Sequence, residues 1–274
     1  MRVARVRVRV MAVRDTFCDL ARYYDHIMDH VDYDRWFTVT TALAELLPRD
    51  FIHLDAACGT GTLLKRLRRT GWRTIGVDLS PAMLRAGLSM RRPPPGMAPP
   101  AAAADLRALP FQSRIDYVTC LFDSVNFLLD IDDVRRMFAE VHGILKDTGL
   151  FYFDIVTERM VTQHFDNQEW TEQDGRFSTT WRSSYDRRTR VTETEVRVGT
   201  GDGGVFLERI YEVDEIEAAV ADAGLELLGA YDAQTWHAPK KRTTRIDFVA
   251  ARDPSRPLRK RFGAVRSQLR GRLA

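Results

Sequence analysis

The chain has 274 residues, of which 45% are hydrophobic and 29% are charged, and its formal net charge is +3 at pH 7. This length suffices for one large α/β domain with additions, and no apolar run of about 18 residues predicts a membrane-spanning helix. Because residues 1–14 carry +5 and residues 252–274 carry +7, the body between them carries −9, which disfavours a nucleic-acid substrate and favours a small one.

The three cysteines, Cys18, Cys58 and Cys120, have no spacing typical of a zinc or redox motif. An odd number of thiols in a chain of this size fits a reducing compartment, where cysteines act as small hydrophobic residues. The first residues also lack the apolar core of a secretion signal. We therefore expect a cytoplasmic protein without a metal site and without a membrane partner.

The chain opens with a basic N-terminal extension and a helical segment. Residues 1–14 alternate valine and arginine, and we expect them to lie outside the fold. Residues 15–50 carry apolar side chains at helical spacing and predict a cap of two helices, which includes Tyr24 and Trp36. Aromatic residues at helical spacing are usually core residues, so packing and ligand contact are equally open for these two.

A strand, a glycine turn and a helix follow one another from residue 51 to residue 69. Asp55 lies near the end of the strand, and Gly59 and Gly61 form the turn. Such a turn lets a ligand approach bare backbone, and the start of the helix presents unpaired N–H groups with a partial positive charge. A dinucleotide fingerprint has a third glycine where Leu64 stands, which disfavours an NAD-type oxidoreductase.

Two further acids end predicted strands. Asp78 ends a second buried strand and precedes a helix over residues 81–90. A carboxylate at this place can accept hydrogen bonds from both hydroxyls of a ribose. Asp105 follows an alanine-rich strand over residues 101–104. The proline-rich residues 93–100 predict an exposed connection between the two.

The next strand leads into a run of polar side chains. Residues 115–123 predict a strand that is buried on both faces, and its end carries Asp123, followed by Ser124 and Asn126. These three either orient a substrate or cap the loop by binding nearby backbone N–H groups, and the sequence leaves both open. A further helix and strand complete a core that we place at residues 51–165.

The remaining residues predict an insert, the end of the sheet and a tail. Alternating side chains predict a three-stranded antiparallel insert within residues 166–212, which could serve as a homodimer surface. Residues 213–252 predict a helix and a closing pair of strands. Residues 253–274 predict an arginine-rich tail, helical near its end. We expect both basic ends of the chain to be solvated without a partner.

Three stretches carry a resemblance to the class I S-adenosylmethionine (SAM) methyltransferases. They occur in the family's order and read Asp55-Ala-Ala-Cys-Gly-Thr-Gly61, Gly76-Val-Asp-Leu-Ser-Pro-Ala-Met-Leu84 and Ala104-Asp-Leu-Arg-Ala-Leu-Pro-Phe111. The resemblance extends over residues 24–155, and more loosely to residue 252. It implies an α/β fold in which a seven-stranded, doubly wound, Rossmann-like sheet carries the helical cap, with the antiparallel insert as a lid over the substrate pocket.

A fourth stretch, Phe122-Asp-Ser-Val-Asn-Phe-Leu128, is similar to the motif beside the methyl group in bacterial small-molecule methyltransferases. It lacks the Asn/Asp-Pro-Pro-Tyr/Phe signature of enzymes that methylate exocyclic base amines or protein glutamine. The phrase Ala21-Arg-Tyr-Tyr-Asp25 is similar to the cap that folds over SAM in the same branch, which puts Tyr24 near the transferable methyl. The resemblance therefore implies SAM as cofactor and a small-molecule acceptor.

The resemblance also implies roles for single residues. Asp78 binds the ribose hydroxyls, and Asp105 binds the adenine amino group. The turn from Gly59 to Gly61 approaches the amino-acid portion, whose ammonium Asp55 helps to hold. The cofactor-binding candidates are Tyr24, Trp36, Asp55, Ala57, Cys58, Gly59, Thr60, Gly61, Asp78, Leu79, Met83, Asp105, Leu106, Leu121 and Phe122. The substrate candidates are Asp123 and Asn126, and the catalytic candidates are His237 and Tyr24.

The expected reaction is in-line displacement of the methyl group from the sulfonium, which depends on placement more than on catalytic groups. A neutral amine needs alignment alone, whereas a hydroxyl acceptor needs a base such as His237, which the resemblance places in a loop at the ligand-binding end of the sheet. We expect transfer to nitrogen ahead of oxygen. The alternatives are a sensor or partner subunit that binds SAM without catalysis, and the oxidoreductase disfavoured above.

Overall fold

The computed structural model describes residues 15–89, 100–112, 115–175 and 177–273. The basic extension at residues 1–14 and residues 93–99 of the proline-rich connection lie outside these residues. Within the described residues, no helix is both long enough and apolar enough to cross a bilayer.

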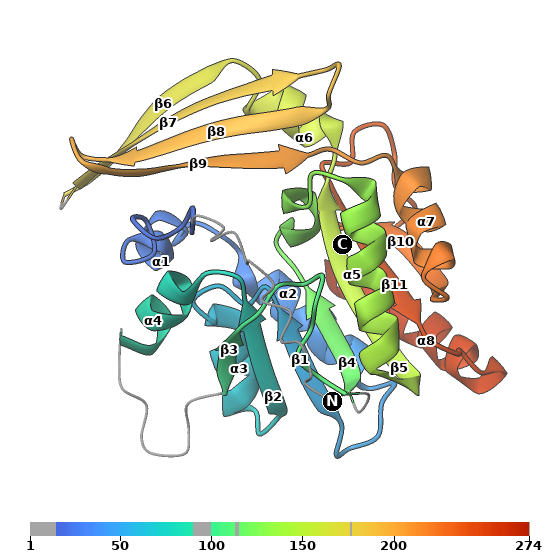
Figure 1. Cartoon of the computed structure of the whole chain (residues 1–274). Coiled ribbons are helices and arrows are strands. Elements are labelled where there is room, and N and C mark those ends of the chain that lie inside the picture. The colour runs from blue at the N-terminus through green and yellow to red at the C-terminus, as the bar shows by residue number, and fades with distance from the viewer. Residues whose placement is uncertain (1–14, 90–99, 113–114, 176, 274) are drawn as a thin grey trace, which may run out of the picture.

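A seven-stranded sheet forms the centre of the molecule (Figure 1). Its strand order is β10-β11-β5-β4-β1-β2-β3, in which β11 runs antiparallel to both neighbours and every other pair is parallel. Strands β2 and β3 lie on one side of β1, and β4 and β5 lie on the other, so the strand order reverses between β1 and β4. A ligand crevice is expected at the carboxyl ends of these two strands. The predicted α/β sheet is confirmed. Its strands are Ile52–Ala56 (β1), Arg73–Asp78 (β2), Ala101–Ala103 (β3), Ile115–Cys120 (β4), Leu145–Val156 (β5), Glu226–Asp232 (β10) and Arg245–Ala251 (β11).

Helices cover both faces of this sheet. One face packs on α5 (Ile131–Ile144) and α7 (Val213–Asp222). The other face packs on α2 (Tyr33–Ala44), α3 (Thr62–Arg69) and α8 (Arg256–Leu273). Strand β4 is buried at all six positions, as predicted for a strand that lies between two layers.

The insert is a four-stranded antiparallel sheet rather than a three-stranded one. Strands β7 (Phe177–Asp186), β8 (Val191–Val198) and β9 (Asp202–Arg209) are the predicted three, and β6 (Gln168–Asp174) adds an edge. The sequence pattern misses β6 because its residues are mostly polar and exposed, without an apolar alternation. Figure 1 shows the insert above α1, joined to the core through α6 (Glu158–His164).

The first part of the cap is less helical than predicted. Its described residues hold one short helix, α1 (Tyr24–Ile27), flanked by turns, whereas α2 matches the prediction. Leu20 and Ile27 are buried against Val196 and Val198 of β8. Tertiary packing on the insert, rather than a continuous helix, therefore positions this segment.

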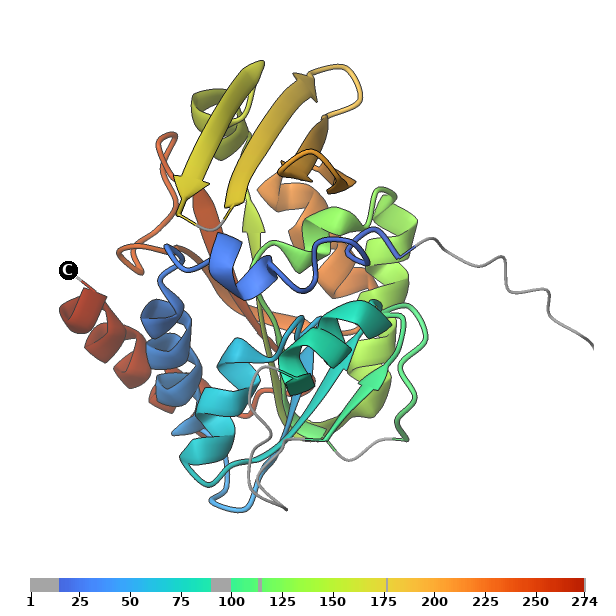
Figure 2. The same ribbon diagram turned by 90° about the vertical axis from the view of Figure 1, so that its left-hand side faces the viewer.

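The C-terminal segment is not a solvated tail. Helix α8 buries Leu258, Phe262, Val265 and Leu269 on the side of the molecule that also holds α2 (Figure 2). The spacing of these four residues forms a helical stripe, which the intervening arginines obscure in the sequence. The expectation that this basic end is a solvated tail is wrong.

Candidate functional site

The glycine turn after β1 is held against the end of β2. Gly59 and Gly61 have φ angles of +57° and +78°, a left-handed backbone that other residues rarely adopt. The N–H of Gly59 donates a hydrogen bond of 2.7 Å to the Asp78 carboxylate. A Cβ atom on Gly59 would lie 3.4 Å from Met83 of α4 (Pro81–Ser89). The turn therefore presents bare backbone beside a carboxylate.

Asp78 ends β2 with part of its carboxylate uncommitted. One oxygen accepts the N–H of Gly59, and the other accepts the N–H of Ser80 at 2.8 Å. Because a carboxylate can accept about four hydrogen bonds, this one has capacity for further donors. Burial raises the pKa of Asp78, and the two backbone donors oppose that shift. A ligand that donated hydroxyl groups here would offset the cost of desolvation.

Asp55 ends a buried chain of polar side chains that crosses three strands. Its carboxylate accepts a hydrogen bond of 2.8 Å from Thr119. The Thr119 hydroxyl also lies 3.0 Å from Nε2 of His53, whose Nδ1 atom lies 2.7 Å from the hydroxyl of Thr74. Burial raises the pKa of Asp55 to about 7 and lowers the pKa of His53 to about 3. A nearby cation would favour the ionised form of this carboxylate.

The cap places side chains over the rim, by which we mean the carboxyl ends of β1, β2 and β4. Thr60 of the glycine turn donates a hydrogen bond to Asp25 of α1. Tyr24 is partly buried, and its pKa is raised by burial and by neighbouring charges that include Asp123 and Asp78. Tyr24 therefore lies near the acids at the ends of β2 and β4, the two strands that flank β1.

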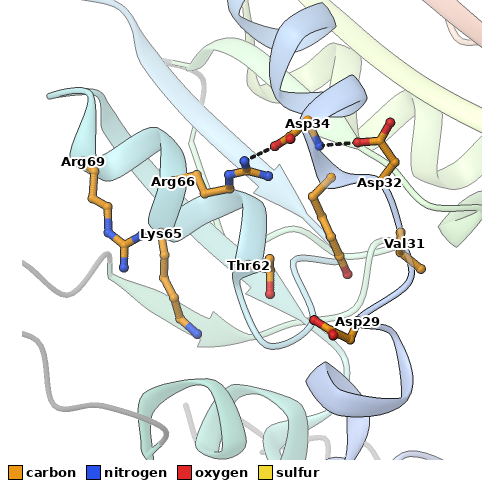
Figure 3. A pocket seen from close by; sticks show the side chains of 9 residues that line it. Asp29, Val31, Asp32, Asp34, Thr62, Lys65, Arg66 and Arg69 are labelled. Carbon is orange, nitrogen blue, oxygen red and sulfur yellow. Dashed lines mark hydrogen bonds and ion pairs between the residues drawn. The ribbon is translucent and has the colours of Figure 1, made fainter.

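A cleft of about 430 Å³ opens beside the turn, between the start of α2 and α3 (Figure 3). Thr62 and Lys65 line it from α3, and Arg66 pairs across it with Asp34. Tyr33 also lines the cleft, and its pKa is raised by burial and by the charges of acids at the rim. The cleft therefore adjoins both the start of α3 and the acids under the cap.

Two consecutive residues after β4 have left-handed backbone conformations. Phe122 and Asp123 have φ angles of +62° and +53°, and each such residue costs about 1–3 kcal/mol. The N–H of Asp123 donates a hydrogen bond of 2.8 Å to Asp154, and Arg245 donates two hydrogen bonds of 3.1 Å to the Asp123 carboxylate. The ring of Phe122 packs edge-on against Trp36, with centroids 5.3 Å apart. A buried network therefore holds a strained loop, a feature typical of functional sites.

Residues 54–149 match the family described as "Methyltransferase domain". A provisionally named methyltransferase of Geobacillus sp. (strain WCH70) is 29% identical over 245 residues, which cover 86% of this chain and 99% of the relative. The crystal structure of an S-adenosylmethionine-dependent methyltransferase from Clostridium acetobutylicum ATCC 824 has a TM-score of 0.73 and 27% identity, over 84% of this chain and 96% of that one. A SAM-bound amino pentose methyltransferase from Micromonospora echinaspora has a TM-score of 0.64 and 24% identity, over 84% of this chain and 96% of that one.

These likenesses together support a class I SAM-dependent methyltransferase. Three features of this methyltransferase fit its cofactor. The glycine turn leaves room for a ligand to approach the backbone. Asp78 retains capacity to accept hydroxyl donors, and Asp55 is a buried carboxylate that a cation would stabilise.

Asp105 is already paired within the methyltransferase. Its carboxylate accepts hydrogen bonds of 2.6 to 3.2 Å from the guanidinium of Arg107, which also reaches Asp133 at 2.7 Å. Side-chain hydrogen bonds from Arg107 lower the pKa of Asp105. A contact with the adenine amino group would therefore have to share this carboxylate with Arg107, a partner that the sequence analysis did not anticipate.

The apolar candidates of the methyltransferase differ in burial. Met83 and Leu121 are buried, Leu106 and Phe122 are partly buried, and Leu79 is 53% exposed. Since Leu79 directly follows Asp78 in sequence, a large apolar side chain lies uncovered beside the proposed ribose site, where a ligand could pack on it.

Ala57 and Cys58 belong to the turn itself. Ala57 has a left-handed φ of +60°, and the N–H of Cys58 donates a hydrogen bond of 2.9 Å to the carbonyl of Val77. Burial raises the pKa of Cys58, which keeps its thiol protonated at neutral pH. These two residues shape the turn of the methyltransferase.

Two predicted residues have their hydrogen bonds away from the acids at the rim. His237 is exposed in the loop between β10 and β11, and its Nδ1 atom lies 2.9 Å from the carbonyl of Thr235 in that loop. Among the described residues, no hydrogen bond or ion pair joins His237 to the acids at the rim. Asn126 is buried, donates a hydrogen bond of 2.8 Å to the Arg209 carbonyl and accepts one of 3.0 Å from the Val156 N–H. Its amide joins β9 to β5, and is thus committed to the backbone of the methyltransferase.

Trp36 is buried, as the packing alternative predicts. The guanidinium groups of Arg35 and Arg245 lie 4.9 and 5.4 Å from the centroid of its ring. Its indole N–H donates a hydrogen bond of 2.9 Å to Asp154. Packing is confirmed for this residue, whereas its contact with the cofactor stays a prediction.

Three charged residues next to Asp123 were not predicted from the sequence. Arg245 donates to both Asp123 and Asp154, and Glu208 of β9 is partly buried and forms a side-chain hydrogen bond with Asp123. A signal for Asp154 and Arg245 is present, because Asp154 is a charged residue within an apolar stretch and Arg245 is a charged residue that begins one. Glu208 has no such signal, because its direction depends on the strand pairing of the insert.

Proposed function

We propose that this methyltransferase moves the methyl group of SAM to a small-molecule acceptor, with nitrogen favoured over oxygen. The observation that carries the proposal is a surplus of carboxylates at the rim. Asp55, Asp78 and Asp123 lie there, and Arg245 pairs with Asp123. Asp25 of the cap adds a fourth carboxylate, which accepts a hydrogen bond from the glycine turn. A surplus of negative charge attracts cations, and both the sulfonium of SAM and a protonated amine are cations.

The roles of single residues follow from this proposal. Asp78 binds the ribose hydroxyls, the turn from Gly59 to Gly61 approaches the amino-acid portion, and Asp55 holds the ammonium of that portion. Tyr24 lies beside the reacting methyl. SAM, when bound, supplies a methyl group that is already activated on a sulfonium. The chain's own task is therefore to bind, to orient and to exclude water.

The cap and the insert support the exclusion of water. Arg22 of the cap pairs with Asp202 of β9, and the apolar cluster of Leu20, Ile27, Val196 and Val198 closes the space between the two segments. We propose that the insert is a lid over the acceptor. A homodimer contact, the other alternative, would use the outer face of the insert.

One further observation favours an amine as acceptor, and a second favours a small molecule over a nucleic acid. The Micromonospora echinaspora protein is an amino pentose methyltransferase, so this fold serves an amine-bearing small molecule elsewhere. The segment after β4 reads Phe122-Asp-Ser-Val-Asn-Phe-Leu128, without the two prolines typical of enzymes that methylate bases or protein glutamine. The location of the protein in the cytoplasm stays a prediction.

Turnover tests the proposal directly. The protein is incubated with SAM and a panel of amino sugars and amino acids, together with their hydroxyl counterparts, and products are analysed by mass spectrometry. We expect amines to gain one methyl group in step with formation of S-adenosylhomocysteine (SAH). Methylation of the hydroxyl compounds alone would move the acceptor atom to oxygen. SAM binding without any product would instead favour the sensor alternative.

A further inference from the structure

The lid brings a second carboxyl group to Asp123. Glu208 of β9 is partly buried and forms a side-chain hydrogen bond with Asp123. Burial and the charge of Asp123 raise the pKa of Glu208, whereas the charge of Arg245 lowers it. Arg245 lies 3.1 Å from Asp123, and this guanidinium is shared with Asp154 at 3.0 Å. Arg245 therefore cannot balance the charge of both Asp123 and Glu208, because it also pairs with Asp154.

A separate observation lies next to this pair on the lid. Thr192 of β8 is directly opposite Glu208 in the β8–β9 register, and directly opposite residues project from the same face of a sheet. Thr192 is only 2% exposed, and its hydroxyl has no hydrogen-bond partner among the described residues. A buried hydroxyl without a partner is destabilising, so this one is suited to meet a group that is supplied by a ligand.

The same face of the lid carries further buried hydroxyl groups. Ser183 and Thr194 lie opposite each other on β7 and β8 and share a hydrogen bond of 2.9 Å. Along β8, the buried positions alternate from Thr192 through Thr194 to Val196, which packs on the cap. This face is therefore the inner face of the lid. Its apolar part, at Val196, packs on the cap, and its polar part, at Thr192 and Thr194, lies next to it along β8.

The chemistry of these groups identifies a ligand class. Two contacting carboxylates ionise together only when a cation joins them, and an ammonium group can donate hydrogen bonds to both. A threonine hydroxyl both donates and accepts, so it matches a second hydroxyl. Resting on the proposed methyl transfer, we propose that Asp123, Glu208 and Thr192 form the acceptor subsite, which binds an ammonium group that carries a neighbouring hydroxyl. The lid thereby contributes to the choice of acceptor as well as covering it.

The experiment compares two probes that differ in one group. 2-Aminoethanol carries the ammonium and the neighbouring hydroxyl, whereas ethylene glycol replaces the ammonium by a second hydroxyl. Binding of each is measured by saturation-transfer NMR at pH 7, with and without SAH. We expect the wild-type protein to prefer 2-aminoethanol by about tenfold or more, because a hydrogen bond to a charged group contributes about 1.5–3 kcal/mol.

Variants assign this preference to the lid. Glu208→Gln keeps the size of the side chain and a hydrogen-bonding amide, and we expect it to lose most of the preference. Thr192→Val should weaken 2-aminoethanol severalfold and leave ethylamine, which lacks the hydroxyl, unchanged. Glu193→Gln is the matched control, because Glu193 is exposed on the outer face of β8 and loses the same charge. Thermal unfolding confirms that each variant is folded.

The outcomes separate this proposal from the one on which it rests. Equal binding of the two probes by the wild-type protein, or an unchanged preference in Glu208→Gln, would overturn the acceptor subsite. Failure of SAH to bind the wild-type protein would contradict the cofactor site instead, and the measurement without SAH would still decide the subsite.

Discussion

The indole N–H of Trp36 donates a hydrogen bond of 2.9 Å to the carboxylate of Asp154, and so joins the cap to strand β5 of the seven-stranded sheet. The same carboxylate accepts the N–H of Asp123 at 2.8 Å and a guanidinium N–H of Arg245 at 3.0 Å. Asp154 is fully buried. One buried carboxylate therefore connects the cap, the strained loop after β4 and the strand β11 beside the proposed acceptor subsite.

Removal of this carboxylate should destabilise the whole protein. Asp154→Ala leaves the buried indole N–H of Trp36 without its acceptor and removes one of the two carboxylates that pair with Arg245, and we expect the free energy of unfolding to fall by about 3–5 kcal/mol. Urea unfolding followed by circular dichroism measures the change. Asp147→Ala on the same strand is the control, because its side chain is 85% exposed, and it should change stability by less than about 0.5 kcal/mol. Similar losses in both variants would contradict the connecting role of Asp154.

Asp55 should make the ligand-free protein less stable as the pH rises. The unfolded chain releases this proton near the ordinary pKa of 3.8, whereas the folded protein holds it up to about 7. Between these values the folded state binds more protons, so its stability falls by ~1.4 kcal/mol per pH unit, or about 4 kcal/mol in all. Asp55→Asn removes the effect and keeps an acceptor for Thr119. We expect the variant to match the wild type near pH 4 and to exceed it increasingly up to pH 7.

Urea unfolding of both proteins across this pH range tests the expectation. His53 titrates in the same range in both proteins, since burial lowers its pKa to about 3, and its contribution cancels in the difference. A difference between variant and wild type that did not grow with pH would show that the Asp55 carboxylate is ionised throughout.

The core of the fold was predictable because its signals are local. Strand β4 is apolar where it lies between two layers, and Gly59 and Gly61 stand where the backbone must be left-handed. The carboxyl ends of parallel strands meet at one edge, so Asp55 and Asp78 could be brought together from their places in the sequence alone. Their surroundings, such as the Gly59 N–H on Asp78, follow from the same geometry.

The charged partners were not predictable because they join distant segments. Trp36 and Asp154 are 118 positions apart, and the contact of Glu208 with Asp123 depends on the register of the insert. Arg107 lies only two positions from Asp105, yet the sequence does not reveal that its guanidinium turns back onto that carboxylate. Pairings of this kind arise from tertiary packing. They cannot be predicted from the periodicity of apolar residues or from the positions of strand ends in the sequence.

Loss of His237 should leave methyl transfer intact, contrary to the sequence-based expectation that this residue is a catalytic base. His237 is exposed and hydrogen-bonds within its own loop. We expect His237→Ala to retain kcat within about twofold, because an exposed substitution away from the reacting groups removes no transition-state contact. Steady-state turnover of an amine found in the acceptor panel measures this. A variant that still binds SAM but no longer turns over would restore His237 as the base.

The central claim is that the rim formed by the glycine turn and Asp78 holds SAM. Calorimetric titration of SAM into the wild-type protein and into Asp78→Asn tests it, with Asp50→Asn, an exposed position before β1, as the control. Asn cannot offer two charged acceptor oxygens, and a hydrogen bond to a charged group contributes about 1.5–3 kcal/mol, so affinity should fall by about 10- to 100-fold. Thermal unfolding shows whether the variant is folded. Wild-type affinity in Asp78→Asn, or a wild-type protein that does not bind SAM, would contradict the account.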